Sequence, residues 1–191
     1  MLIMNVILKS MRMQILLFRR LRSSQSIMPN LFYLVQCSLK RIGSGSRRQL
    51  LMTKTVIVVD KPEITDIETF MQVVEEIALR KKLIQAGNNL RVDIKAREAM
   101  GNTRVGVDTV MPHVKAEYVI KPTVLIIRVR QPLTWQDQLP ARVFIILLVR
   151  EPDPFLEDFI IRLVNEDFID ELADFNQPPE SIRQLVIEGR K

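Results

Sequence analysis

Two long apolar runs limit most strongly what this chain can fold into. Residues 123–129 and 143–149 are rich in Val, Ile and Leu, and each has the length of a β-strand. Near-continuous apolar runs are typical of strands that are buried on both faces, because a strand with one wet face alternates apolar and polar residues. A third run, residues 55–59, ends at Asp60-Lys61-Pro62 and also predicts a strand. We therefore expect a sheet whose central strands are fully buried.

Helical patterns separate and follow these runs. The first helix is expected to begin at a capping box made by Thr65 and Glu68. Its apolar residues recur at helical spacing, namely Ile67, Phe70, Met71, Val74, Ile77 and Ala78. Gly87-Asn88-Asn89 is typical of a segment that follows a helix. A short second helix is expected to be capped by Asp93 and closed by Gly101.

Three more helices are expected near the C-terminus, over residues 155–163, 168–172 and 181–187. Strands interleaved with helices indicate an α/β fold. Residues 52–191 are numerous enough to bury one hydrophobic core. We therefore predict a single sandwich domain over residues 52–191, with a mixed β-sheet flanked by helices.

The distribution of charge divides the chain near residue 51. The first 51 residues contain nine Lys or Arg and no Asp or Glu. Of the 28 basic residues in the chain, 19 remain for the rest, against 22 acidic residues, so the rest has a net charge of −3. The overall charge of +6 is therefore a property of the N-terminal part, and we expect no nucleic-acid partner for the folded domain.

Residues 1–51 form a basic leader that we expect to be disordered or not native. Lys9, Arg12 and Arg19 interrupt its apolar runs, so none reaches the roughly 20 apolar residues that span a bilayer, and no stable membrane insertion is expected. A signal peptide, a transit peptide and a basic arm that binds anionic lipid or nucleic acid are the alternatives. Because Met52 opens directly onto a predicted strand, we favour Met52 as the native start.

The chain has one histidine, His113, which follows Pro112 at the end of a short apolar stretch. A neutral imidazole is a good nucleophile near pH 7, and a proline restricts the backbone that directs it. By composition alone, a lone histidine is more often an ordinary surface or core residue. The one cysteine, Cys37, lies in the leader, which leaves the domain without the ligands of a usual zinc site. We expect no metal or other cofactor, and a reducing, cytoplasmic location.

The segment that ends at His113 resembles the active-site segment of enzyme IIA domains of the mannitol/fructose class (EIIA type-2), which belong to the bacterial phosphoenolpyruvate-dependent sugar phosphotransferase system (PTS). The residues that match the family motif in register are Arg97, Glu98, Thr103, Gly106, Pro112 and His113. Lys121-Pro122-Thr123, Leu133-Thr134-Trp135 and Pro179-Glu180-Ser181 follow in the order of the family's later elements. The resemblance covers about residues 53–188.

This resemblance implies a phosphotransferase component that carries a phosphoryl group. His113 would accept the group from the histidine-containing phosphocarrier protein HPr and pass it to an enzyme IIB, for coupled sugar uptake and phosphorylation. Arg97 would stabilise the phosphate through its planar guanidinium. Glu98, Thr103, Gly106 and Pro112 would support the site, with the Thr103 hydroxyl and backbone N–H groups near Gly106 as further donors.

Departures from the family motif keep a second interpretation open. Family members usually have another histidine after the second core strand, and this chain has none. Asp108 replaces a glycine and adds negative charge near the acceptor, unless Arg97, Arg104 or Lys115 offsets it. The alternative is a catalytically degenerate, enzyme IIA-like regulatory module that controls a transcription factor or transporter by protein contact.

Overall fold

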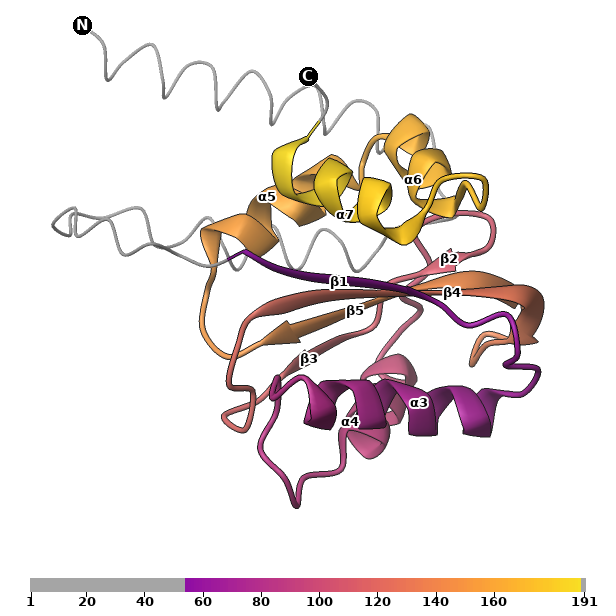
Figure 1. Cartoon of the computed structure of the whole chain (residues 1–191). Coiled ribbons are helices and arrows are strands. Elements are labelled where there is room, and N and C mark those ends of the chain that lie inside the picture. The colour runs from indigo at the N-terminus through magenta and orange to yellow at the C-terminus, as the bar shows by residue number, and fades with distance from the viewer. Residues whose placement is uncertain (1–53, 190–191) are drawn as a thin grey trace, which may run out of the picture.

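The computed structural model of the protein describes residues 54–189, so the expected leader, residues 1–51, lies outside the described residues. The described chain builds one five-stranded sheet with helices on both faces (Figure 1). Its elements, in chain order, are β1 (Thr55–Asp60), α3 (Ile67–Arg80), α4 (Leu90–Ala99), β2 (Thr109–Val110), β3 (His113–Lys115), β4 (Thr123–Thr134), β5 (Pro140–Val149), α5 (Pro154–Arg162), α6 (Glu166–Ala173) and α7 (Pro179–Glu188). The predicted α/β sandwich is confirmed.

The sheet is mixed, and the two apolar runs lie at its centre. The strand order is β1-β4-β5-β2, and β3 also pairs with β5. β4 and β5 are antiparallel, with Ile126 opposite Ile145, whereas β1 is parallel to β4 and both β2 and β3 are parallel to β5. Because each central strand has neighbours on both edges and helices on both faces, the near-continuous apolar sequence of each run is explained.

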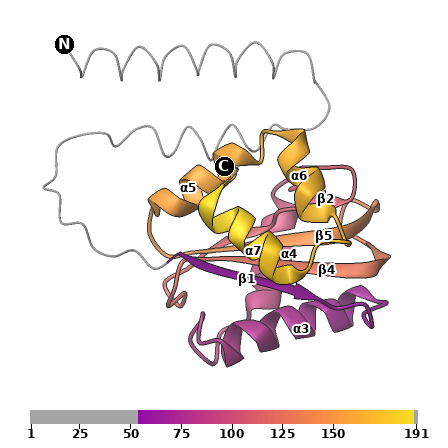
Figure 2. The same ribbon diagram turned by 45° about the horizontal axis from the view of Figure 1, so that its top comes forward.

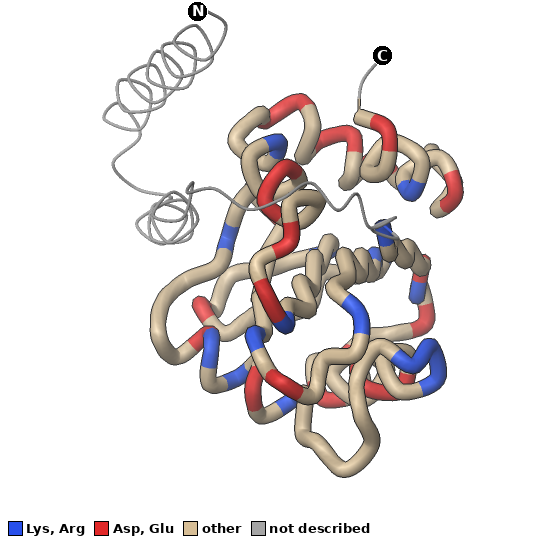
Figure 3. The backbone as a smooth tube through the Cα atoms, turned by 90° about the vertical axis from the view of Figure 1, so that its left-hand side faces the viewer, with Lys and Arg blue, Asp and Glu red and all other residues tan. Residues whose placement is uncertain are grey.

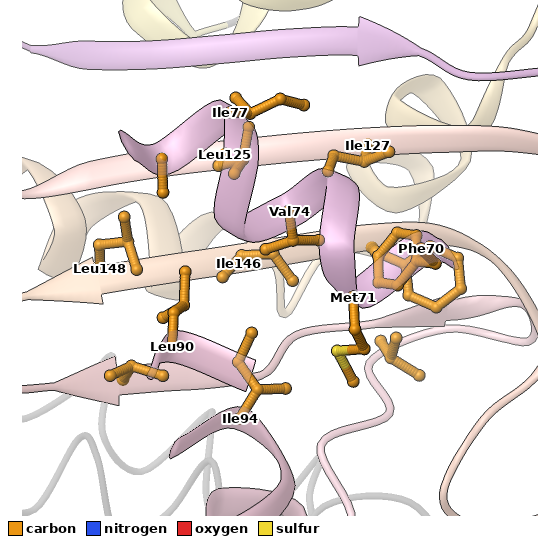
Figure 4. Close-up of a cluster of buried hydrophobic side chains, with 14 of the residues drawn as sticks. Phe70, Met71, Val74, Ile77, Leu90, Ile94, Leu125, Ile127, Ile146 and Leu148 are labelled. Carbon is orange, nitrogen blue, oxygen red and sulfur yellow. The ribbon is translucent and has the colours of Figure 1, made fainter. Parts of the chain in front are cut away.

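Alternate residues of the central strands serve two separate cores, one on each face of the sheet. Helices α3 and α4 cover one face, and α5, α6 and α7 cover the other (Figures 1 and 2). Figure 4 shows the first core, in which side chains of α3 and α4 meet those of β4 and β5, among them Phe70, Met71, Val74, Ile77, Leu90, Ile94, Leu125, Ile127, Ile146 and Leu148. The second core includes Val124, Ile126, Ile145 and Leu147.

The first two helices begin at caps other than the predicted ones. Asp66, and not Thr65, accepts the hydrogen bond from the Thr69 N–H at 2.8 Å. Asn89 caps α4 by accepting from the Val92 N–H at 3.2 Å, one helical turn before Asp93. Asp93 lies inside the helix and accepts a hydrogen bond from the Tyr118 hydroxyl. In both cases two good capping residues lie close together in the sequence, and the sequence pattern alone does not distinguish them.

The three predicted C-terminal helices are present as α5, α6 and α7, and Asp and Glu are frequent along them (Figure 3). Part of this acidic sequence is structural, because Asp153 caps α5 by accepting from the N–H groups of Phe155 and Leu156. Asp158 pairs with Arg162 one turn later in α5. Within residues 54–189, no three His, Cys, Asp or Glu side chains are grouped so that they could hold a metal ion. None of the described helices is both long and apolar enough to cross a membrane.

Candidate functional site

His113 is the first residue of β3, and its side chain is half-buried. It lies opposite Leu147 in the parallel ladder between β3 and β5. The carbonyl of the preceding residue, the buried Pro112, accepts a hydrogen bond from the Leu147 N–H at 3.0 Å. The sheet therefore fixes the backbone on both sides of the imidazole. The sequence indicated only that Pro112 restricts the backbone here, and β2 and β3 were missed because strands of two or three residues leave no periodic signal.

The structure brings Arg97 to His113, as the resemblance implied. Arg97 lies in the last turn of α4, and its Nε is 3.2 Å from Nδ1 and 3.1 Å from Nε2 of the imidazole. The lone-pair directions of the two ring nitrogens diverge in the ring plane, so one N–H equally near both nitrogens lies along neither direction. The guanidinium thus lies against the imidazole without a well-aligned hydrogen bond to either ring nitrogen. Its Nη1 donates to the Gly101 carbonyl at 3.1 Å.

The electrostatic environment keeps the imidazole neutral. Burial, followed by the positive charge of Arg97, lowers the pKa of His113 from its ordinary value of 6.5 to about 4. Burial also lowers the pKa of Arg97, while Glu98 acts in the opposite direction. An arginine remains charged at neutral pH in spite of such a shift. The site therefore presents a neutral nitrogen nucleophile next to a fixed positive charge.

Glu98, which the resemblance implied as a supporting residue, is held away from solvent. Its side chain accepts hydrogen bonds from the Thr103 hydroxyl and, at 3.0 Å, from Nε1 of Trp135. Burial raises the pKa of Glu98, and the two hydrogen bonds lower it in part. One residue whose contact the sequence analysis missed is Trp135, which was quoted there only for the resemblance. A hint was available, because a buried indole N–H requires an acceptor.

Gly106 is required by a close approach to another layer of the protein. A Cβ at this position would lie 2.8 Å from Cγ2 of Ile169 in α6. The N–H groups of Val105 and Gly106 both donate to the Thr109 carbonyl, at 3.0 and 3.2 Å. The Thr103 hydroxyl is likewise engaged by Glu98. The additional donors that the sequence suggested are thus used inside the protein, and Arg97 is the clearer candidate for contact with an anion.

The charged residues of the loop before His113 are paired with the hairpin that joins β4 and β5. Arg104 contacts both carboxylate oxygens of Asp137, at 2.8 and 3.0 Å. Asp108 accepts from Nε of Arg142 at 2.7 Å. The partner that offsets the charge of Asp108 is therefore Arg142, and not Arg97, Arg104 or Lys115 as the sequence suggested. These pairs also tie the loop to the hairpin.

Comparison with known proteins gives a family and a fold. The family described as "Phosphoenolpyruvate-dependent sugar phosphotransferase system, EIIA 2" matches residues 50–188. The structure is similar to that of nitrogen regulatory protein IIA-Ntr from Neisseria meningitidis, with a TM-score of 0.55, 22% identity, and coverage of 68% of this chain and 92% of that one. No curated protein matches the chain in sequence.

A second similar structure comes from Escherichia coli, a complex of enzyme IIAMTL and phosphorylated enzyme IIBMTL. The TM-score is 0.51 at 16% identity, and the match covers 72% of this chain and 96% of that one. At these identities the structural matches establish the fold alone. The family match, which spans most of the chain, establishes the family.

Proposed function

This chain belongs to the EIIA 2 family of the phosphoenolpyruvate-dependent sugar phosphotransferase system, and from this we propose that His113 is the residue that carries a phosphoryl group. The single observation that supports this best is the contact between Arg97 and a neutral, half-buried imidazole. Phosphoryl transfer needs a nucleophile held in line with phosphorus and positive charge beside the transferred oxygens. Arg97 and His113 supply these two components from α4 and β3.

The proposed step exchanges one nitrogen–phosphorus bond for another. An unprotonated ring nitrogen of His113 attacks the phosphorus of a phosphohistidine on HPr. The bond between phosphorus and the donor imidazole breaks, and the donor ring leaves with that electron pair. The other ring nitrogen of His113 keeps its proton, so no general base is needed. In the delivery step a nucleophile of the enzyme IIB would attack phosphorus, the bond between phosphorus and His113 would break, and the imidazole would leave with that electron pair and return to its neutral state.

Arg97 would act by charge and by hydrogen bonding. The oxygens of the transferred group are negatively charged, and a guanidinium can donate to two of them at once. Because its Nε already lies near the ring, Arg97 needs little movement to reach a group attached to either ring nitrogen. Pro112 would assist only indirectly, since its carbonyl fixes β3 to β5 next to the nucleophile.

We propose HPr as the phosphoryl donor and an enzyme IIB as the acceptor. The family membership supports a place in a sugar phosphotransferase system, and one similar structure is titled as a complex of enzyme IIAMTL with phosphorylated enzyme IIBMTL. The transfer to enzyme IIB would couple this chain to sugar uptake and phosphorylation. A carrier of this kind recognises its protein partners and does not bind the sugar.

Phosphorylation by purified components tests the proposal. The full chain is incubated with phosphoenolpyruvate, enzyme I and HPr, and the phosphoryl group is measured as an acid-labile gain in intact mass. We expect one phosphoryl group on the wild type and on Lys115→Ala, a control that removes an exposed charge two residues away. We expect none on His113→Ala. Equal labelling of wild type and His113→Ala would refute the assignment of His113.

The second candidate function is regulation by protein contact. It is favoured by the name of one similar structure, nitrogen regulatory protein IIA-Ntr, and by the presence of a single histidine in the chain. In this case the chain would control a transcription factor or transporter by protein contact alone, and His113 would accept no phosphoryl group. The incubation with HPr separates the two, because a module that has lost carrier activity gains no phosphoryl group.

A further inference from the structure

We propose that Glu98 is a positioning residue, whose hydrogen bonds to Thr103 and Trp135 hold the end of α4 so that Arg97 faces His113. The inference rests on the proposed function of His113 and Arg97. It goes beyond that function by naming the contacts that fix the distance between the nucleophile and the positive charge.

Arg97 and Glu98 are consecutive residues near the end of α4. Side chains at successive positions point about 100° apart around the helix axis. Arg97 points toward the imidazole in β3, while Glu98 points toward Trp135 just after β4. A bond that fixes the direction of Glu98 therefore also fixes the rotation of the helix end that directs Arg97.

Trp135, the partner of Glu98, is held rigidly in the first core. Its side chain is 1% exposed and contacts the rings of Phe70 and Phe144, with centroids 6.3 and 5.2 Å away. The indole N–H is thus held by the core beneath α3, and Glu98 accepts from it at 3.0 Å. The hydrogen bond connects the end of α4 to the first core.

Glu98 is also hydrogen-bonded to the segment that leads to His113. It accepts from the Thr103 hydroxyl, and the Thr103 carbonyl accepts from the Met111 N–H at 2.8 Å. Arg97 contacts His113, the chain leads back from His113 to Met111, Met111 bonds to Thr103, and Thr103 bonds to Glu98, the residue next to Arg97. Both ends of the contact between Arg97 and His113 are therefore fixed through one carboxylate.

The burial of this carboxylate also indicates a directional role. Glu98 is 8% exposed, and a charged group costs free energy when it is removed from water. An apolar side chain would fill the same space without that cost, but it would not fix the orientation of the helix end. Two hydrogen bonds to a carboxylate do fix it.

Four variants of the full chain separate a positioning role from general stability. Glu98→Ala, Trp135→Phe and Thr103→Val each break one or both hydrogen bonds. Glu98→Gln is the conservative variant, because its amide oxygen can accept from Trp135 while its amide nitrogen donates to Thr103. Asp60→Asn is the matched control, since it weakens the ion pair with the buried Arg128 at another part of the sheet.

Two measurements are made on each variant that folds. The first is the NMR titration of the imidazole, which is unambiguous because His113 is the only histidine. The second is the rate of phosphoryl acceptance from phosphorylated HPr. Glu98→Ala, Trp135→Phe and Thr103→Val are expected to raise the pKa of His113 by about one unit, because Arg97 moves away, and to slow acceptance roughly tenfold or more. Glu98→Gln and Asp60→Asn should stay near wild type in both.

The results can overturn the proposal in a recognisable way. The three disruptive variants are compared with Asp60→Asn at equal thermal stability. If they keep the wild-type pKa of His113, or change it no more than Asp60→Asn does, then Glu98 does not position Arg97. If the wild type itself accepts no phosphoryl group, the proposed function fails. In that case the titration still decides whether Glu98 holds Arg97 against His113.

Discussion

Arg128 and Arg97 have opposite environments. Arg128 is fully buried in β4, and it donates to both oxygens of Asp60, at 2.6 and 2.9 Å, and to the carbonyls of Asp174 and Gln177, each at 2.8 Å. Arg97 is half-buried, and its hydrogen bonds go to neutral groups, the His113 ring and the Gly101 carbonyl. Among residues 54–189, no carboxylate forms an ion pair with Arg97.

The difference separates an arginine that holds the fold from one that is available to a ligand. Arg128 connects the end of β1 with the loop between α6 and α7, and its charge is already neutralised by Asp60. The charge of Arg97 is neutralised only weakly by its surroundings, and the guanidinium lies beside the neutral imidazole of His113. An incoming phosphoryl group would supply the negative charge that Arg97 lacks.

The largest effect is expected from Arg128→Met. Arg128 is the buried partner of an ion pair whose other side chain, Asp60, is 36% exposed, so water can replace the guanidinium at Asp60 but not at the two carbonyls. Loss of the donor to these carbonyls is expected to cost about 3 kcal/mol or more of the free energy of unfolding. Urea denaturation measures this loss. The fraction that remains folded should still accept phosphoryl groups at the wild-type rate, and a slower rate would show that the two arginines are not independent.

The pH dependence of stability should reveal His113 itself. Its pKa is about 4 in the folded protein and near 6.5 in the unfolded chain, so the unfolded state binds more protons between these values. The stability contributed by neutral His113 is complete above pH 6.5, falls as the pH is lowered toward 4, and the loss is about 3 kcal/mol at most. His113→Gln should lack this component. Parallel pH profiles of the two proteins would contradict the burial of a neutral imidazole.

Arg97→Gln should slow phosphoryl acceptance and leave stability nearly unchanged, which is the opposite of what we expect for Arg128→Met. Loss of one preorganised donor to a charged transition state typically slows a reaction about a hundredfold. The guanidinium makes no ion pair in the described structure, so the free energy of unfolding should change by less than about 1 kcal/mol. Rapid-quench measurement of phosphoryl acceptance, with thermal unfolding as the control, tests both parts. A large loss of stability would place Arg97 with Arg128 as a structural residue.

The smallest effect is expected from Asp108→Asn. Asp108 pairs with Arg142, whose side chain is 43% exposed, and ion pairs of this kind contribute about 0.2–1 kcal/mol. Because Arg142 already offsets its charge, removal of Asp108 should change the rate of phosphoryl acceptance by less than about threefold. A much faster rate would mean that Asp108 repels the incoming group and that Arg142 does not shield it.

The contrast also shows what could be predicted from the sequence. The two apolar runs were enough to predict the central strands, and the spacing in register with a family motif was enough to join Arg97 to His113. Arg128 was not recognised, since a single arginine inside an apolar run has no local signal of its partners, which lie 46 to 68 residues away in sequence. Trp135 and Arg142 were missed for the same reason. Contacts between distant segments depend on the folded arrangement, which composition and periodicity do not specify.

The most direct test of the account is the 15N NMR spectrum of the full chain labelled at histidine, before and after incubation with phosphoenolpyruvate, enzyme I and HPr. The chain has one histidine, so every imidazole signal comes from His113. We expect the signal of one ring nitrogen to shift and to gain a coupling to phosphorus, in wild type and in the folded fraction of Arg128→Met, and we expect the change to be much slower in Arg97→Gln. An unchanged imidazole spectrum in the wild type would refute the assignment of His113 as the phosphoryl carrier.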